Sequence, residues 1–446
     1  MSPFHQILGN NLAANITNFT VWFAITFWVY LETKSVFATG MIAGIYLVLT
    51  GAFGIWFGSI VDHNAKKTAM LGSSLVSFGF YLVALAALLA FPLERFTNPY
   101  GFELWLLVLL VMFGVISGNI RSIALPTLVT MLIPEDQRDK ANGLVGMVSG
   151  IGFLTTSVIS GVLVAFGGML AVLILALVFT AAAFWHLWFV KLDEGRPAPS
   201  ADTPAGLRKV DIAGTIRVVA AVPGLFALIL FATFNNFLGG IFMALLDAYG
   251  LSLVSVEVWG LTFGVLSTAF IISGIIIART GLGPKPLRTL LMVNVITWTV
   301  CIFFTIQPSF WLLAAGCFVW MFLGPYAEAA EQTTLQKVVP QERQGRVFGF
   351  AQSVEQAASP LTAFLIGPLT EFMVIPFMTT GAGAALIGGW FGTGPARGIA
   401  LVFTIAGLVG LVVTIIAFNS KYYRHLSAAY AQAPDDVSTP PGSAEG

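Results

Sequence analysis

Charged residues are scarce in this chain. Only 9% of its 446 residues are Asp, Glu, Lys or Arg, whereas soluble domains carry about 25%. So few charges cannot cover a water-exposed surface, which excludes an ordinary soluble protein. The formal net charge is +0, so the chain also lacks the basic footprint that nucleic-acid-binding proteins carry.

Cysteine and histidine are also rare, and their positions predict neither a disulfide nor a metal site. Cys301 and Cys317 both fall inside apolar runs, where a thiol acts as a small packing group. No phosphate-binding loop is present, and no Ser, His and Asp pattern suggests catalysis. We therefore predict no cofactor and no enzymatic activity. The four histidines are scattered, at His5, His63, His186 and His425.

Long apolar runs dominate the rest of the chain, and 57% of the residues are hydrophobic. A helix needs about 20 apolar residues to cross a bilayer. Inside the bilayer each run must satisfy its own backbone hydrogen bonds, so helix is the expected state. The sequence predicts twelve spanning helices, near residues 11–31, 40–61, 68–91, 103–126, 142–164, 168–190, 222–247, 257–279, 288–307, 310–335, 347–373 and 397–418.

The loops between these runs predict the orientation. Seventeen of the 21 Lys and Arg residues fall on one side, three fall on the other, and Arg121 lies within a span. Because basic loops are retained in the cytoplasm, both termini are predicted to be cytoplasmic. The N-terminus lacks the basic flank of a signal peptide, so the first run is interpreted as a spanning helix.

The longest cytoplasmic connection divides the helices six and six. It is rich in Pro, Ala and charge, which is typical of a linker. We predict a first six-helix half and a second one, joined by this linker and followed by a disordered polar tail. The predicted boundaries are 1–190 for the first half, 191–217 for the linker, 218–420 for the second half and 421–446 for the tail.

The second half repeats the first. Pro134 and Gly143 correspond to Pro340 and Gly349, and both pairs are separated by 206 positions. Acid and base correspond in the same register, since Asp136 matches Glu342 and Lys140 matches Arg346. A repeat of six helices keeps the same topology, so the halves should be related by an axis along the membrane normal. Two such halves around a central site suit transport by alternating access.

The turn after the second span carries a recognisable motif. Gly58 is followed four residues later by Asp62 and then by Lys66 and Lys67. This pattern resembles the signature of the major facilitator superfamily. The stretches 121–129 and 332–349 look like the branch that includes macrolide and enterobactin exporters. The resemblance implies an all-α membrane fold of twelve helices in two pseudo-symmetric halves, present as a monomer in a bacterial cytoplasmic (inner) membrane.

In this motif Gly58 allows close helix approach, and Asp62 is predicted to meet the positive N-terminal end of the eleventh span near Phe348 and Gly349. The resemblance implies that this latch closes the cytoplasmic side. Asp62 could instead meet a base in its own loop, and the competing interpretation of the motif is a plain solvated turn. The equivalent turn of the second half has Ala278 at the acid position, so a symmetrical second latch is not expected.

Ionisable residues within spans are costly and so suggest function. Arg121, Glu328, Glu331 and Glu355 occupy such positions in the fourth, tenth and eleventh spans. The resemblance implies that Arg121 and Glu328 face each other across the cavity, and we predict an ion pair or proton site among the four. Two alternatives remain open: Glu331 reaches the interface, or Arg121 ties down carbonyl groups.

Amide side chains on two spans predict a cavity lining. Asparagines in the first span recur at spacings of four and three residues and share a helix face with a tryptophan. Two further asparagines lie in the seventh span. The competing interpretation is hydrogen bonding between helices. The predicted lining is Asn11, Asn15, Asn18, Trp22, Asn235 and Asn236.

The sequence therefore predicts a secondary transporter that exports a small amphipathic or lipophilic compound in exchange for protons. The partners are this small molecule, protons and the lipid bilayer, without nucleic acid. The run Gly146 to Gly161 lacks the Gly-Pro pair usual in antiporters of the superfamily, so a proton-symported nutrient importer stays open, as does a carrier of a lipid-like molecule. A membrane sensor would need a soluble output domain larger than any segment outside the spans.

Overall fold

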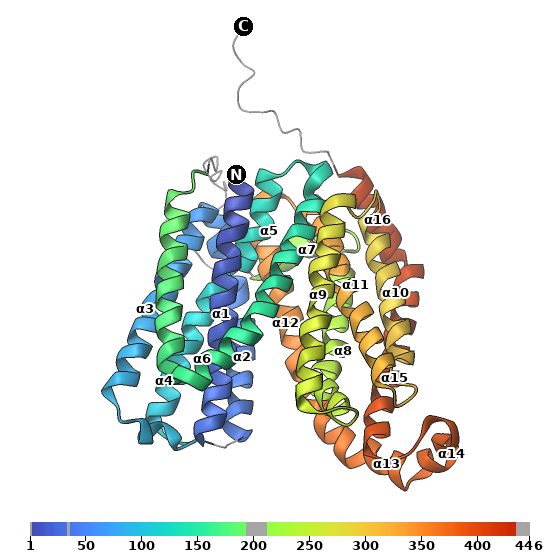
Figure 1. Cartoon of the computed structure of the whole chain (residues 1–446). Helices are drawn as coiled ribbons and strands as arrows, with labels where there is room; N and C mark the ends of the chain where they lie inside the picture. The colour runs from blue at the N-terminus through green and yellow to red at the C-terminus, as the bar shows by residue number, and fades with distance from the viewer. Residues whose placement is uncertain (1, 34–35, 193–211, 434–446) are drawn as a thin grey trace.

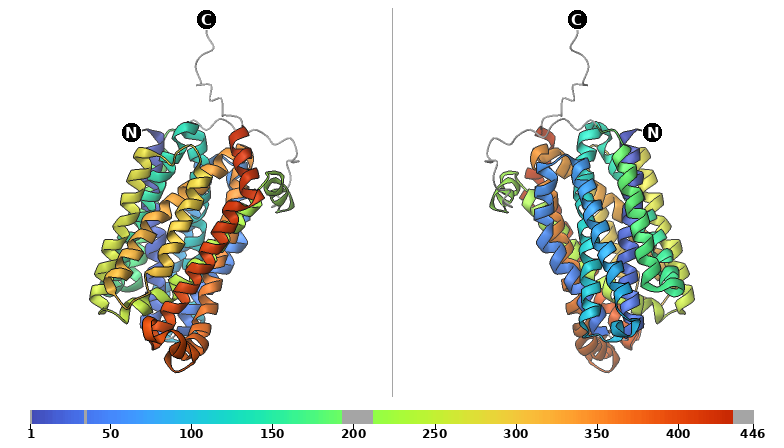
Figure 2. Two further views of the ribbon diagram at one scale, coloured as in Figure 1. Left: turned by 90° about the vertical axis from the view of Figure 1, so that its right-hand side faces the viewer. Right: turned by 90° about the vertical axis from the view of Figure 1, so that its left-hand side faces the viewer.

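The computed structural model describes residues 2–33, 36–192 and 212–433. Over these residues the chain forms helices and turns, with no β-strand. The helices run side by side in one bundle (Figures 1 and 2). Apolar runs fold in this way because backbone groups surrounded by hydrocarbon must find hydrogen-bond partners within their own segment.

Among the described residues, six main helices form the first half and six form the second. In the first half they are α1 (Pro3–Thr33), α2 (Val36–His63), α3 (Lys66–Ala90), α4 (Phe102–Gly118), α5 (Ile120–Leu132) and α6 (Arg138–Phe189). In the second half they are α8 (Leu225–Leu251), α9 (Val256–Thr280), α10 (Pro286–Phe303), α11 (Phe310–Val338), α12 (Gln344–Leu369) and α15 (Pro395–Asn419). The shorter elements are α7 (Ile212–Ala221), α13 (Ile375–Thr379), α14 (Ala382–Phe391) and α16 (Lys421–Gln432), with η1 (Leu93–Thr97), η2 (Glu135–Gln137), η3 (Gln341–Arg343) and the π-helical η4 (Thr370–Val374).

The number of crossings agrees with the prediction once α6 is divided. In the described part of the chain, eleven helices are long and apolar enough to cross a membrane, with α4 and α5 together forming one of them. Helix α6 contains two predicted spans, and its helical geometry breaks at Gly168, where φ is 57°. Figure 1 shows the two legs of α6 crossing and returning. Counting both legs gives twelve crossings in an all-α membrane fold.

Both ends of the described chain lie at one side of the bundle. Helix α1 begins there, and α15 ends there before α16 (Figure 1). We call this the termini side and the opposite one the far side. Helix α2 ends at the termini side, while α6 and α12 begin there.

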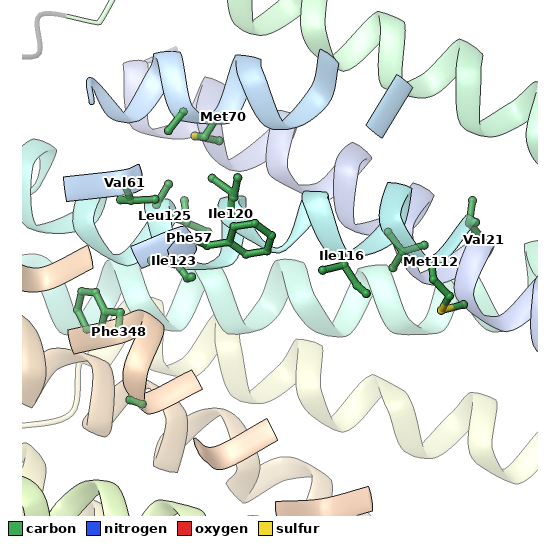
Figure 3. Close-up of a cluster of buried hydrophobic side chains, with 14 of the residues drawn as sticks. Val21, Phe57, Val61, Met70, Met112, Ile116, Ile120, Ile123, Leu125 and Phe348 are labelled. Carbon is green, nitrogen blue, oxygen red and sulfur yellow. The ribbon is translucent and has the colours of Figure 1, made fainter. Parts of the chain in front are cut away.

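The apolar core is continuous between the halves near the termini side. One buried cluster contains Val61 and Leu125 from the first half together with Phe348 from the second, and Figure 3 shows these three side chains on neighbouring helices. A second cluster, in which the rings of Phe242 and Phe403 stack with centroids 4.9 Å apart, consists of second-half residues alone. The halves are thus held together at the termini side.

The predicted disordered tail differs from the structure over its first part. Residues Lys421–Gln432 form α16. Its first turn is capped by Ser420, whose hydroxyl accepts from the Tyr423 backbone N–H at 3.1 Å. Leu426 is buried against the bundle, which supplies the apolar contact that stabilises a short helix. Residues 434–446 of the predicted tail and most of the predicted linker, 193–211, lie outside the described residues, while α7 begins at Ile212.

Candidate functional site

A cavity of about 440 Å³ lies between the two halves. Helices α1, α5 and α6 supply one wall, and α8, α10, α11 and α12 supply the other. Among the described residues that line it, none is Lys, Arg or His. The polar lining consists of Asn11, Asn15, Ser122, Asn142, Ser149, Asn235, Asn236, Asn294, Glu328, Glu331, Gln332, Gln352, Glu355 and Gln356.

Three carboxyl groups from the second half reach this cavity. Glu328 and Glu331 are three residues apart on α11 and so share a helix face, and Glu355 projects from α12. Glu328 is exposed to the cavity. The carboxyl groups of Glu331 and Glu355 lie close enough to interact with each other. The buried Oε1 atom of each finds no donor in the described part of the protein.

This pair of carboxyl groups has a simple chemical consequence. Two ionised carboxylates in contact repel each other, and neither can donate a hydrogen bond. One shared proton removes the repulsion and supplies the missing donor. The pair of Glu331 and Glu355 is therefore suited to hold a single proton, as adjacent carboxyl groups do elsewhere.

Four of the six predicted amide and aromatic lining residues surround the cavity, namely Asn11, Asn15, Asn235 and Asn236. Asn235 is held by its neighbours, since its Nδ2 donates to Phe231 O at 2.7 Å and its Oδ1 accepts from Trp298 Nε1 at 2.8 Å.

The other two predicted lining residues lie elsewhere. Asn18 accepts from the Tyr81 hydroxyl at 3.3 Å and packs against Gly118. Trp22 packs on Tyr46 with ring centroids 4.2 Å apart. Both contacts lie inside the first half, and neither side chain is among the residues that line this cavity.

The predicted pairing of Arg121 with the acids across the cavity is wrong. The Arg121 guanidinium is buried in the first half, where it donates to Asn10 Oδ1 at 2.7 Å and to Ser74 Oγ at 2.5 Å. Ser122, the next residue, lines the cavity instead. One residue turns a helix by about 100°, which separates the two side chains. Arg121 thus ties α5 to α1 and α3.

We expect Arg121→Met to destabilise the protein without acting on the acids directly. The change leaves two buried oxygens without a donor, at about 1–3 kcal/mol each. The thermal unfolding midpoint of the purified protein should therefore fall, while Ser122→Ala, which changes an exposed hydroxyl one residue away, should lower the midpoint much less. An unchanged midpoint for Arg121→Met would contradict a structural role.

Asp62 lies at the N-terminus of α12. Its Oδ1 accepts from the Gly345 backbone N–H at 2.7 Å, and its Oδ2 accepts from that of Arg346 at 2.9 Å. The Arg346 guanidinium adds an ion pair, with Nε 3.4 Å from Oδ2. A carboxylate is favourable here because the N-terminus of a helix carries unpaired donors and partial positive charge. The buried Asp62 is thus no solvated turn residue.

The other motif residues support this contact. A Cβ atom on Gly58 would lie 2.4 Å from Gly345 O, so only glycine lets α2 and α12 approach this closely. Lys66 donates to Val61 O at 2.6 Å, and Lys67 donates to Val190 O at 2.6 Å. Both lysines bind carbonyl groups at the ends of first-half helices, where cations are favourable.

Further contacts between the halves, which sequence reasoning missed, lie beside the cavity at the termini side. Asn142 donates to Gln336 Oε1 at 2.9 Å, and Gln336 donates to Pro126 O at 3.0 Å. Gln352 donates to Ser122 Oγ at 2.8 Å. The available signal was the polar character of these positions beside the repeated segments. Together with Asp62, they close the termini side of the cavity.

Comparison with known proteins identifies the family. The sequence profile of the Major Facilitator Superfamily matches residues 7–363. Macrolide efflux protein A of Streptococcus pyogenes is 21% identical over 375 residues, covering 81% of this chain and 88% of that protein. A protein of the same name from Enterococcus faecalis is 20% identical over 322 residues, covering 69% of this chain and 94% of that protein.

Solved structures show the same fold. A bacterial homologue of the iron transporter ferroportin, in an outward-facing state, has a TM-score of 0.69 at 17% identity, covering 94% of this chain and 100% of that one. A proton:xylose symporter bound to a sugar analogue has a TM-score of 0.68 at 12% identity, covering 96% and 99%. At these identities the likeness concerns the fold alone. The match over residues 7–363 and the shared architecture together show that this chain belongs to the Major Facilitator Superfamily of membrane transporters.

Proposed function

We propose that this transporter exports a small amphipathic compound in exchange for protons. The observation that carries the proposal is that Glu331 and Glu355 lie near each other in one cavity, which no described Lys, Arg or His lines. A carboxyl pair that holds one proton can release it when the cavity opens to the other side of the membrane. A cationic or strongly dipolar substrate would favour that release.

The cavity also supports a substrate class. Half of the lining residues are polar, mostly amides, and the others are mostly apolar. Together with the exposed Glu328, this mixed lining suits an amphipathic molecule that carries a positive charge. Macrolides that bear an amino sugar have this character, and the curated relatives are macrolide efflux proteins. We therefore infer that macrolide-like compounds are substrates.

The direction of transport rests on the orientation of the chain. Seventeen of the 21 Lys and Arg residues lie in segments assigned to one side, which supports a cytoplasmic termini side in the bacterial inner membrane. With the termini side closed by Asp62 and its neighbours, we assign this structure to the state of the proposed cycle in which external protons would bind. For export, the termini side must then open, so that the substrate can enter the cavity from the cytoplasm.

Uptake of a radiolabelled macrolide into proteoliposomes with an acidic lumen tests this proposal. We expect accumulation that collapses with the pH gradient and that falls about tenfold in Glu328→Gln, as loss of one interaction with a charged group predicts. Protein-free liposomes measure passive entry of the weak base. Equal uptake with and without protein, for macrolides and for permanently charged amphipathic cations, would remove the export proposal.

A further inference from the structure

A second contact joins the halves on the opposite flank of the termini side. Asp139, at the start of α6, belongs to the first half, and Leu282, in the turn between α9 and α10, belongs to the second. Asp139 Oδ2 accepts from the Leu282 backbone N–H at 2.7 Å. The other carboxylate oxygen, Oδ1, accepts from the Lys140 backbone N–H, also at 2.7 Å. One acid thus bridges a helix N-terminus and a turn of the other half.

The turn after α9 lies so close to the start of α6 that several positions there accept only glycine. Gly281 has φ of +72°, and a Cβ atom there would lie 2.4 Å from Asp139 Oδ2. Beside it, the helices α6 and α9 meet through glycines. A Cβ atom on Gly274 would lie 2.7 Å from Gly143 O, and one on Gly143 would lie 2.9 Å from Ala278 N. The turn therefore sits directly on the start of α6.

The internal repeat relates this contact to the one made by Asp62. The repeat offset of 206 positions places Asp139 in register with Gly345, which donates its N–H to Asp62. The turn after α9 also corresponds to the turn after α2, because each follows the second crossing of its half. On the first flank the turn supplies the acid and the helix start supplies the N–H. On the second flank the helix start supplies the acid and the turn supplies the N–H.

We propose that Asp139 is the acid of a second latch, with the roles of donor and acceptor exchanged between the halves. Ala278 stands at the position equivalent to Asp62 and has no carboxylate, so the second half cannot form a latch of the first kind. The contact of Asp139 takes its place. Asp139 is a positioning residue: it holds the turn at Leu282 against α6 while the cavity is closed at the termini side. Because the two latches lie on opposite flanks of one interface, both must open before one half can rotate away from the other. The role in gating rests on the proposed alternating-access function, but the closed interface itself does not depend on substrate or protons.

The test measures closure directly. Ser149 lines the cavity on α6, and Ser149→Cys introduces a thiol there with almost no change of volume. The native Cys301 and Cys317 are buried, so the parent protein gives a low background. A membrane-impermeant maleimide is applied to the termini side of oriented proteoliposomes, and the labelling rate at residue 149 is measured without substrate or pH gradient.

Four single variants and one double variant are compared in this background. Asp62→Ala removes the first latch and Asp139→Ala the second. Gly281→Ala disturbs the second latch from the partner half. Asp136→Ala is the matched control, since this acid lies three residues before Asp139 and is exposed to solvent. The thermal unfolding midpoint of each variant shows that it is folded.

We expect Asp139→Ala and Gly281→Ala each to raise the labelling rate about tenfold, as loss of one charge-assisted hydrogen bond predicts, with the control unchanged. Asp62→Ala removes two such bonds and an ion pair, so its increase should be larger. The double variant Asp62→Ala/Asp139→Ala should show the product of the two increases. If Asp139→Ala lowers the unfolding midpoint but leaves labelling at the parent rate, Asp139 only caps α6 and the second latch does not exist. A protein that transports no tested compound would still give either result, so failure of the proposed function is separate from failure of this inference.

Discussion

Gly58→Ala is expected to reduce transport about 10- to 100-fold in a protein that still folds. The added Cβ atom would lie 2.4 Å from Gly345 O and 2.9 Å from Arg346 Cα. Both contacts are to backbone atoms of a helix, which cannot rotate away as a side chain would. Overpacking of this kind costs about 1–3 kcal/mol, and here only the state closed at the termini side bears the cost. The population of that state, and with it the rate of the transport cycle, should fall accordingly.

The matched control is Gly51→Ala, two helical turns earlier on α2. A Cβ atom there would meet nothing within 4 Å, and alanine favours helix more than glycine does. Macrolide uptake into proteoliposomes should be normal for Gly51→Ala and strongly reduced for Gly58→Ala, at equal amounts of folded protein. Normal uptake with Gly58→Ala would show that α2 and α12 need not approach this closely during transport.

Replacing either member of the carboxyl pair is expected to abolish accumulation driven by a pH gradient. In Glu331→Gln or Glu355→Gln the amide supplies a permanent donor to the remaining carboxylate, so the pair no longer needs a shared proton. The variant can bind substrate and change conformation, but it exchanges no proton at this position. Gradient-driven uptake should fall to the level of protein-free liposomes.

Substrate exchange separates loss of coupling from loss of function. In liposomes loaded with unlabelled macrolide, exchange for external labelled macrolide needs no net proton movement. We expect exchange to persist in both Gln variants. Glu371→Gln, an exposed glutamate beyond the cavity on η4, should behave as the parent in both assays. Gradient-driven uptake that survives in Glu331→Gln and in Glu355→Gln would place the proton site elsewhere.

The sequence predicted the fold because each bilayer crossing leaves a separate hydrophobic signal. Even the two legs of α6 were predicted, since the break at Gly168 falls between two apolar runs. The start of α16 was missed for the opposite reason. Its polar composition is typical of a disordered tail. The helix is explained by the burial of Leu426 and the cap at Ser420, which the sequence pattern does not show.

The site was predicted less completely, because a helix face depends on rotation that the sequence does not specify. Glu328, Glu331 and Glu355 were predicted as a group and reach one cavity. Arg121 was assigned to the wrong face of its helix, one residue away from the cavity-lining Ser122. The contact of Asp139 with Leu282 was also missed, because the donor is a backbone N–H, which almost every residue type has.

The central claim is that substrate and protons move in opposite directions through one cavity, and simultaneous measurement of both fluxes tests it most directly. A pH-sensitive dye is enclosed in proteoliposomes with an acidic lumen, and a permanently charged amphipathic cation is added outside, since such a cation carries no proton of its own. The account predicts a rise of internal pH that follows uptake of the cation, in proportion to it, and that is absent with Glu355→Gln. Uptake of the cation with no change of internal pH, or with a further fall, would contradict exchange for protons.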